Sequence, residues 1–218
     1  MLDRLDLKEE DFDDVVIDEK EFKDLRAETK WLAVARLYTS REDFSNTAFY
    51  TSMRYAWNPA QEVSFRALND NLFVIQARCL GDWKKIVEMG PWLFRGYGVI
   101  IKEYDGIQDP EKVVLDSIEV WIQIHKVPDL YRKEHLVRLM ASKVGVVKKI
   151  IMLTAKDFVR VRVNLKVDTP LKRFTSLNIQ GQGRVVFQLK YEKIPTFCDV
   201  CGLMGHVDEE CGSGEHSP

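Results

Sequence analysis

The chain has 218 residues, of which 45% are hydrophobic and 30% are charged, and its mean hydropathy is −0.24. This balance is typical of a soluble globular protein with a core and excludes a disordered chain. No apolar run approaches the roughly 20 residues of a membrane helix, and the first residues lack the pattern of a secretory signal. Four cysteines do not make a disulfide-stapled scaffold, so we expect an intracellular protein of the nucleus or the cytoplasm.

The net charge of −2 conceals an uneven distribution along the chain. Residues 1–30 carry a net charge of −6 and residues 198–218 a net charge of −5, whereas residues 31–197 carry +9. A basic centre between acidic ends is consistent with a body that binds a polyanion. A basic but merely solvated surface would look the same, so charge alone leaves both interpretations open.

A first α+β unit is predicted at residues 31–105, after an acidic, weakly ordered segment at residues 1–30 that holds at most a short edge strand at residues 12–17. Ser40, with Asp43 three residues later, fits a capping box at the start of the first helix. The expected strands are residues 31–39, 63–68, 71–78 and 97–104, and the expected helices are residues 41–57 and a short one capped by Asp82. The order β-α-β-β-α-β predicts an RRM-like or ferredoxin-like sandwich, with one sheet and two helices on one side.

A second, smaller α+β unit is predicted at residues 112–193, after a turn-rich linker at residues 105–111. The expected strands are residues 118–125, 146–153, 158–167, 174–179 and 184–191, and the one expected helix is residues 132–144. No repeat with a short period is present, although both units begin β-α-β-β.

The most specific motif of the chain is Cys198-x2-Cys201-x4-His206-x4-Cys211, within predicted knuckle residues 195–212. Three thiolates and one imidazole form a tetrahedral set that suits one Zn²⁺. Because four protein ligands close the coordination sphere, the zinc is expected to be structural, with no position left to activate water. Residues 213–218 are expected to form a disordered tail.

Three further stretches, together with this knuckle, resemble plant proteins related to the first open reading frame of LINE-type retroelements. The stretches are residues 92–96 (WLFRG), 118–128 (IEVWIQIHKVP) and 191–197 (YEKIPTF), the last of which runs into the knuckle. The knuckle itself is similar to those of retroviral nucleocapsid and retroelement proteins. The resemblance implies a retrotransposon-derived plant protein that joins an N-terminal domain of unknown function to a zinc knuckle and binds nucleic acid, above all RNA, without catalysis.

The knuckle departs from the nucleocapsid pattern because none of the residues between its ligands is basic. Three thiolates add further negative charge, so this knuckle should repel phosphates. A base could still stack in a cleft formed by Val200, Leu203 and Met204. A structural clip and a protein-docking module are the alternatives.

The sheet of the first unit is the predicted nucleic-acid surface. Strand alternation assigns one set of side chains to its outer face: Arg36, Tyr38, Arg66, Arg78, Lys102 and Tyr104. Cations for phosphates and aromatic rings for bases are what an RRM-like surface needs. The alternatives are a solvated face or a face covered by the second unit. A second basic set is formed by Arg160, Arg162 and Lys166, with Lys148 and Lys149 nearby in sequence.

Two functions from different classes follow from these patterns. The first is a non-catalytic protein that binds RNA or single-stranded DNA; the second is an interaction or scaffold module whose acidic knuckle docks a protein partner. We expect no catalytic residues, no small-molecule substrate and no membrane contact. Clustered carboxylates at Asp105, Asp109, Asp116 and Glu119 raise an enzyme as a third possibility, but they lie near the linker without ligand-like spacing.

Overall fold

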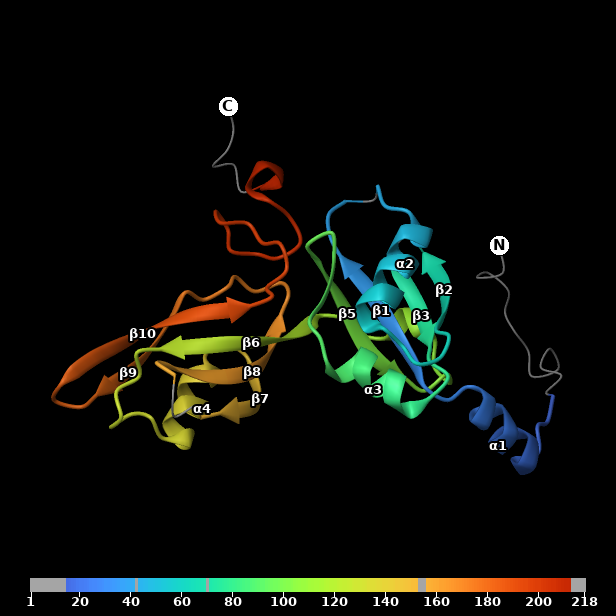
Figure 1. Ribbon diagram of the computed structural model, residues 1–218, viewed down its shortest axis with the longest axis horizontal. Helices are drawn as coiled ribbons and strands as arrows, with labels where there is room; N and C mark the ends of the chain where they lie inside the picture. Colours follow the sequence, from blue (N-terminus) through green and yellow to red (C-terminus); the bar gives the residue numbers. More distant parts are fainter. Residues whose placement is uncertain (1–14, 42, 70, 153–155, 213–218) are drawn as a thin grey trace, which may run out of the picture.

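A computed structural model describes residues 15–41, 43–69, 71–152 and 156–212. Two five-stranded antiparallel sheets lie side by side, and the zinc knuckle follows the last strand (Figure 1). This arrangement confirms the predicted α+β class. Among the described residues, no helix has both the length and the apolar character needed to cross a membrane.

The first unit contains five strands and two helices, and four of the strands and both helices follow the predicted order. Its elements are β1 (Leu32–Tyr38), α2 (Asn46–Trp57), β2 (Ser64–Asn69), β3 (Leu72–Gln76), α3 (Leu80–Glu88), β4 (Trp92–Phe94) and β5 (Tyr97–Tyr104). The strand order is β2-β3-β1-β5-β4, and the first four of these have the order of a ferredoxin-like sheet. Strand β4 was not predicted. It pairs with β5 through a two-residue turn at Arg95 and Gly96, which both have positive φ, as a type I′ hairpin requires.

Helix α2 begins at Asn46 and not at the predicted residue 41. The hydroxyl of Ser45 accepts the backbone N–H of Ala48 at 3.4 Å, so Ser45 is the N-cap. The prediction of Ser40 as the cap was wrong because the backbone N–H of Ser40 instead donates to the carbonyl of Gly205, at 3.1 Å. A contact with the distant knuckle thus replaces the local one.

Helices α2 and α3 cover one face of the first sheet, as predicted. The buried side chains beneath them are Ala33, Ala35, Leu37, Phe49, Met53, Trp57, Val63, Phe73, Ile75, Ala77, Ile86, Phe94, Tyr97 and Val99. Aromatic residues, among them Phe49 stacked on Phe73 at 4.6 Å between ring centroids, fill much of this core.

The second unit repeats the topology of the first. After a 3-10 turn (Pro110–Lys112), its elements are β6 (Ser117–His125), α4 (Glu134–Ser142), β7 (Val146–Ile151), β8 (Phe158–Lys166), β9 (Phe174–Ile179) and β10 (Gly183–Glu192). Its strand order is β7-β8-β6-β10-β9, so β6, β7 and β8 take the positions that β1, β2 and β3 have in the first sheet. A two-stranded hairpin, β4–β5 in the first sheet and β9–β10 in the second, completes each sheet. The units differ in the connection that follows the third strand, which is α3 in the first unit and the loop at residues 167–173 in the second.

The N-terminal segment corrects one prediction and leaves another partly outside the described residues. A helix, α1 (Glu19–Glu28), lies within the segment that was expected to be weakly ordered. Of the predicted edge strand, residues 15–17 are not in a strand and residues 12–14 are outside the described part of the chain, as is the predicted tail at residues 213–218.

Candidate zinc site and nucleic-acid interface

The four predicted metal ligands come together in the knuckle. The ligand atoms of Cys198, Cys201, His206 and Cys211 all lie within 4.8 Å of one another. The Cys201 sulfur is 3.3 Å from Nε2 of His206, and the backbone N–H of Cys201 points to the Cys198 sulfur at 3.5 Å. Three sulfurs and one imidazole nitrogen at this separation fit one tetrahedral Zn²⁺, which confirms the predicted cofactor.

Local backbone geometry builds this cluster. Gly202 and Gly205 have φ values of 75° and 97°, which favour glycine. The N–H of Gly202 donates to the Cys198 carbonyl at 2.8 Å, and Phe197 and Met204 form an isolated β-bridge. Two tight turns, at Gly202 and Gly205, therefore bring the four ligand side chains together.

The knuckle is fastened to both units rather than standing alone. Towards the first unit, Gly205 receives the backbone N–H of Ser40 and lies so close to the Tyr38 ring that an added Cβ would meet it at 2.9 Å. Towards the second unit, the carbonyl of Gly202 accepts the N–H of Leu171 at 2.9 Å. The turns that hold the ligands therefore also contact both units.

Of the three residues predicted to form a base-stacking cleft, Val200, Leu203 and Met204, one is not accessible at the surface. Met204 is only 3% exposed and belongs to the core of the second unit, so it offers no surface to a base. Val200 and Leu203 are half-buried.

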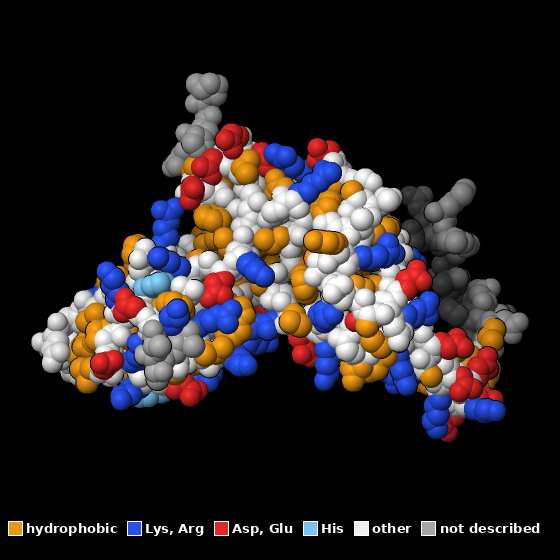
Figure 2. Space-filling model, in the orientation of Figure 1, with side chains coloured by type: hydrophobic (Ala, Val, Ile, Leu, Met, Phe, Trp, Pro, Cys, Tyr) orange, Lys and Arg blue, Asp and Glu red, His pale blue; other side chains and the backbone are white. Residues whose placement is uncertain are grey.

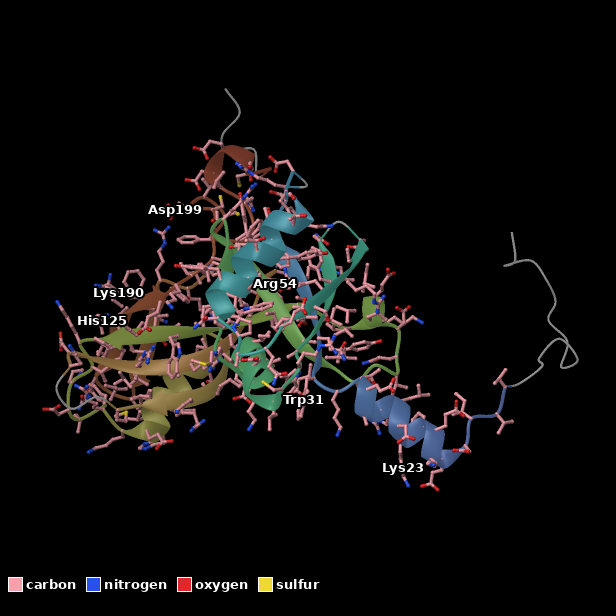
Figure 3. The ribbon with its side chains drawn as sticks, turned by 45° about the vertical axis from the view of Figure 1, so that its right-hand side comes forward. Lys23, Trp31, Arg54, His125, Lys190 and Asp199 are labelled. Atoms are coloured by element: carbon pink, nitrogen blue, oxygen red, sulfur yellow. The ribbon has the colours of Figure 1, made fainter. Side chains whose placement is uncertain are left out.

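The acidic residues of the knuckle are partly neutralised from within the chain. Arg41 pairs with Glu210 at 2.8 Å, and Arg173 pairs with Asp199 at 3.4 Å. Figure 2 shows acidic side chains gathered on the knuckle, and Figure 3 shows Asp199 on its outside. These pairs attach the knuckle to the basic body of the chain.

The outer face of the first sheet is covered, which corrects the prediction of an open nucleic-acid surface. Val34, Leu72, Val74 and Ile100 point to this face, are at most 6% exposed and share one core with the second unit. The sequence had left this alternative open. The second unit packs here because four apolar side chains would otherwise face water.

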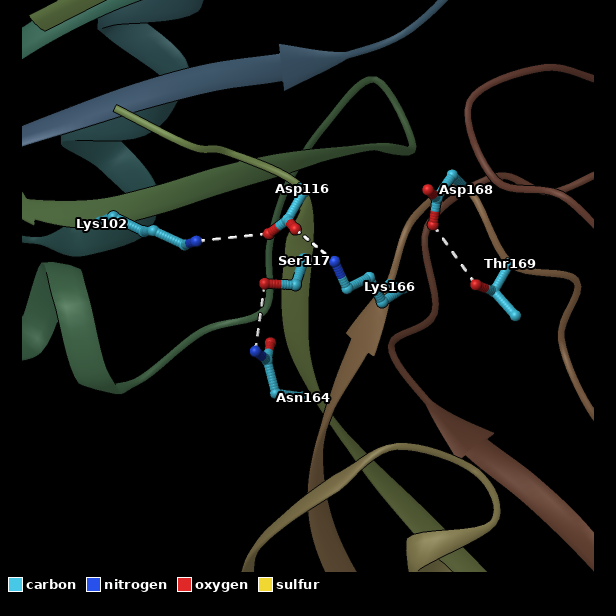
Figure 4. A network of polar contacts seen from close by, with 7 residues as sticks. All are labelled: Lys102, Asp116, Ser117, Asn164, Lys166, Asp168 and Thr169. Atoms are coloured by element: carbon cyan, nitrogen blue, oxygen red, sulfur yellow. Dashed lines mark hydrogen bonds and ion pairs between the residues drawn. The ribbon is translucent and has the colours of Figure 1, made fainter. Parts of the chain in front are cut away.

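Three of the predicted binding residues on this face contact other parts of the chain. The Tyr38 hydroxyl donates to the Val167 carbonyl at 3.4 Å, and the Tyr104 hydroxyl donates to the Gln108 carbonyl at 2.6 Å. Lys102 pairs with Asp116 at 3.4 Å (Figure 4). These residues therefore belong to the contact between the units and the linker that joins them.

The other three predicted residues of the first sheet do not complete a platform. Arg66 and Arg78 are exposed, and Arg36 is half-buried. Without the rings of Tyr38 and Tyr104, they supply charge but no stacking surface.

The outer face of the second sheet is bordered by the first unit on one side, where Arg162 donates to the Glu88 carbonyl, and is otherwise left uncovered by the described residues. Arg160 and Arg162 lie on it as predicted, and the strand register adds aromatic and polar residues that the sequence reasoning missed. We call this surface the Trp121 face, and its residues are Glu119, Trp121, Gln123, His125, Lys148, Lys149, Phe158, Arg160, Arg162, Lys190 and Glu192. None of them is buried. Trp121 and His125 come from β6 and Phe158 from β8, the two strands that correspond to the central pair of a ferredoxin-like sheet.

A ring and a guanidinium group form the centre of the Trp121 face. The guanidinium carbon of Arg160 lies 4.0 Å from the centroid of the Trp121 ring. Glu192 holds this guanidinium with a hydrogen bond of 2.7 Å and also accepts from Gln123 at 2.8 Å. Burial would raise the pKa of Glu192, but the hydrogen bonds from Arg160 and Gln123 outweigh it and lower the pKa, so the carboxylate stays charged.

The remaining cations line the edges of this face. Strand β7 has a β-bulge at Lys148, which has no partner residue in the β7–β8 register. The Lys148 ammonium lies 3.6 Å from the Glu119 carboxylate, and the same carboxylate pairs with Arg162 at 2.8 Å. At the other edge, His125 and Lys190 lie side by side (Figure 3). Burial and the charge of Lys190 lower the pKa of His125, so the imidazole is neutral at pH 7.

Lys166, the third predicted cation of this set, lies at the seam between the units. It pairs with Asp116 at 2.6 Å, and the same carboxylate receives Lys102 (Figure 4). The bond from Lys166 is the main reason that the pKa of Asp116 lies well below its usual range.

Comparison with known proteins finds one family model and distant relatives. The model of a zinc knuckle family matches residues 165–213. An uncharacterized protein of Arabidopsis thaliana is 24% identical over 137 residues, which are 60% of this chain and 42% of that protein. The chain thus spans less than half the length of this plant relative.

Two solved structures overlap with parts of the chain. The three N-terminal RNA-binding domains of the yeast splicing factor Prp24 align with 62% of this chain and 54% of theirs, at 15% identity and a TM-score of 0.26. The first two RRM domains of the yeast poly(U)-binding protein Pub1 align with 73% of this chain and 97% of theirs, at 8% identity and a TM-score of 0.24. The fold assignment rests on the strand order given above and not on these overlaps.

Proposed function

We propose that the chain is a non-catalytic nucleic-acid-binding protein that holds single-stranded RNA or DNA on the Trp121 face. The observation that carries this proposal is the stack of Arg160 on Trp121, at 4.0 Å, on the open side of a sheet. A flat ring or guanidinium plane stacks on any base, and each such contact contributes about 1–3 kcal/mol. The cations around it, Lys148, Lys149 and Lys190, supply phosphate contacts.

The zinc knuckle has a structural role in this proposal. It matches a zinc knuckle family, but its acidic residues pair with Arg41 and Arg173 of the chain's own body. The knuckle then acts by fixing the two units relative to each other, which keeps the outer face of the first sheet closed and that of the second sheet open.

The carboxylates that raised the possibility of an enzyme have structural partners. Asp105 and Asp109 each accept a backbone N–H two residues ahead, at 3.0 Å. Asp116 pairs with two lysines, and Glu119 pairs with Lys148 and Arg162. These roles support a binding function without catalysis.

We also propose an origin in a LINE-type plant retroelement and a place in the nucleus or the cytoplasm. The sequence resemblance, the knuckle match and the plant relative support the origin. The alternative function, a protein partner docked on the acidic knuckle, has less support because Asp199 and Glu210 already have basic partners within the chain.

Two charge-reversal pairs test where nucleic acid binds. The first is Lys149→Glu with Lys190→Glu on the Trp121 face, and the second is Arg66→Glu with Arg78→Glu on the first sheet. Fluorescence polarisation with a labelled single-stranded RNA, and with the equivalent DNA, gives the affinity at several salt concentrations. We expect the first pair to weaken binding strongly and to flatten the salt slope by about 0.7 for each phosphate that is no longer bound. The second pair should have a small effect.

Two outcomes would contradict this proposal. A larger effect of the Arg66 and Arg78 pair would place binding on the first sheet. A wild-type chain that binds neither RNA nor DNA at low salt would favour the protein-docking function. Circular dichroism of each variant shows that its fold is kept.

A further inference from the structure

Helix α1 is exposed along its whole length. None of its ten residues is buried, and Phe22 and Leu25, which lie three positions apart on one side, are 45% and 43% exposed. The side chain of Asp18 caps the helix by accepting the N–H of Glu21 at 2.7 Å. A capped helix of ten residues is still only marginally stable in water, because packing of an apolar side normally supplies most of a helix's stability.

A groove beside α4 has the complementary character. It has a volume of about 560 Å³ and opens between α4, the start of β7 and the loop at residues 167–173. Its apolar lining includes Val144, Val147, Leu165 and Leu171. Four cationic residues also line it, namely Arg138, Lys143, Lys166 and Lys172, and no Asp or Glu is among the described residues that do so. We call it the α4 groove.

The related topology of the two units explains why this groove exists. In the first unit, α3 follows the third strand and lies beside α2. In the second unit, a loop follows the third strand, and the α4 groove opens between this loop and α4, the counterpart of α2. Strand β9 also packs against α4, where the Thr175 hydroxyl donates to the Met140 carbonyl at 3.0 Å, so the groove is confined to the end of α4 near Ser142 and Lys143.

Charge and apolar spacing match α1 to this groove. Between Asp18 and Glu28 the chain has five acidic and three basic residues, so the helix is net acidic where the groove is basic. Figure 1 places α1 at one end of the molecule and α4 towards the other, so an α1 from another copy reaches the groove more readily than the chain's own.

We propose that α1 of one copy of this chain docks in the α4 groove of a second copy. Phe22 and Leu25 would face the apolar lining, and the acidic residues Glu21 and Asp24 would face Lys143 and Lys172. The inference is independent of the nucleic-acid function, since it uses none of the residues of the Trp121 face. A reciprocal exchange closes a dimer, and a one-way exchange extends a head-to-tail chain.

A charge exchange tests this docking. Sedimentation velocity of nuclease-treated full-length protein, over a range of concentrations, gives the association constant. We expect Lys143→Glu with Lys172→Glu, and separately Glu21→Lys with Asp24→Lys, to weaken association by about tenfold each. The chain that carries all four substitutions should recover wild-type association, because the two reversed surfaces again have opposite charge.

Two further variants separate this contact from general charge effects. Phe22→Ala with Leu25→Ala removes the apolar side of α1 and should weaken association without a change in net charge. Lys84→Glu with Lys112→Glu, at exposed sites outside α1 and the α4 groove, is the matched control and should leave association unchanged. A wild-type chain that stays monomeric at every concentration would overturn the proposal. So would failure of the variant with all four charge substitutions to recover association.

Discussion

The two sheets of this protein have related strand orders and opposite exposure. In the first sheet, helices cover one face and the second unit covers the other, so β3 is buried at Leu72, Phe73, Val74 and Ile75 in succession. In the second sheet, β8 alternates between buried and half-buried residues from Phe158 to Leu165. A strand buried on both sides has a continuous apolar run, and a strand with one open side alternates. The site of binding therefore follows from which face is left open and not from the strand order.

Loss of zinc should disturb this contrast most, because the knuckle fastens both units. We expect Cys201→Ser to lower the melting temperature of the whole chain by at least about 12 °C, since structural zinc contributes several kcal/mol to folding and each kcal/mol is worth about 2–4 °C at this size. Differential scanning calorimetry measures the change. The matched control is Cys79→Ser, at a cysteine outside the zinc cluster. An unchanged main transition would show that the knuckle is an independent module.

A charge on the covered face of the first sheet should have the next largest effect. Val34 is fully buried between the two units, so Val34→Asp leaves an unpaired carboxylate in the core and should cost at least about 3 kcal/mol. Thermal unfolding should show a fall of about 6–12 °C. Lys149→Asp, on the open face of the second sheet, should change the melting temperature by less than about 2 °C. Similar losses from both substitutions would contradict the difference in exposure.

Removal of the central ring should reduce nucleic-acid binding with little effect on the fold. Trp121→Ala takes away the stacking plane and the surface that holds Arg160, so we expect affinity for single-stranded RNA or DNA to fall by about 5- to 150-fold. Fluorescence polarisation measures it. Tyr55→Ala removes an aromatic ring that is 89% exposed on α2 and should leave affinity unchanged. Equal effects of the two substitutions would place the stacking elsewhere.

The smallest expected effect concerns the carboxylate at the seam. Asp116→Asn removes the pairs with Lys166 and Lys102 and should lower the melting temperature less than Val34→Asp does. Because folding lowers the pKa of Asp116, its contribution is present above the ordinary carboxyl value of 3.8 and is lost as the pH falls through the lowered value. The difference from wild type, followed by thermal unfolding against pH, should shrink in acid. Asp129→Asn is the control, and a difference that grows in acid would contradict this assignment.

Local patterns predicted the parts of the molecule that local interactions determine. The zinc ligands followed from spacing alone, because two tight turns bring them together. The order of strands and helices in the first unit followed from apolar periods. Helix α2 starts five residues later than predicted because the backbone of Ser40 binds Gly205, a partner that no local pattern reveals.

The candidate binding surface was harder to predict because it depends on how the units pack. The continuous apolar runs of β3 and β5 indicate burial on both sides, whereas the prediction treated both strands as alternating. Residues 118–125 were predicted as a strand, but its outward set of Trp121, Gln123 and His125 was not considered as a surface. Arg160 and Arg162 were identified from charge, whereas the ring beneath them required the strand register.

The contact between Ser40 and Gly205 joins residues that are 165 positions apart, and this separation affects how the chain folds during synthesis. A ribosome adds about 5–20 residues per second, so about 8–33 seconds pass between the emergence of Ser40, just after β1, and that of Gly205 in the knuckle. During this interval the first sheet can complete its helix-covered side, but Val34 and Ile100 still face water. The nascent chain therefore presents an apolar surface until the second unit, which covers this face, has been synthesised.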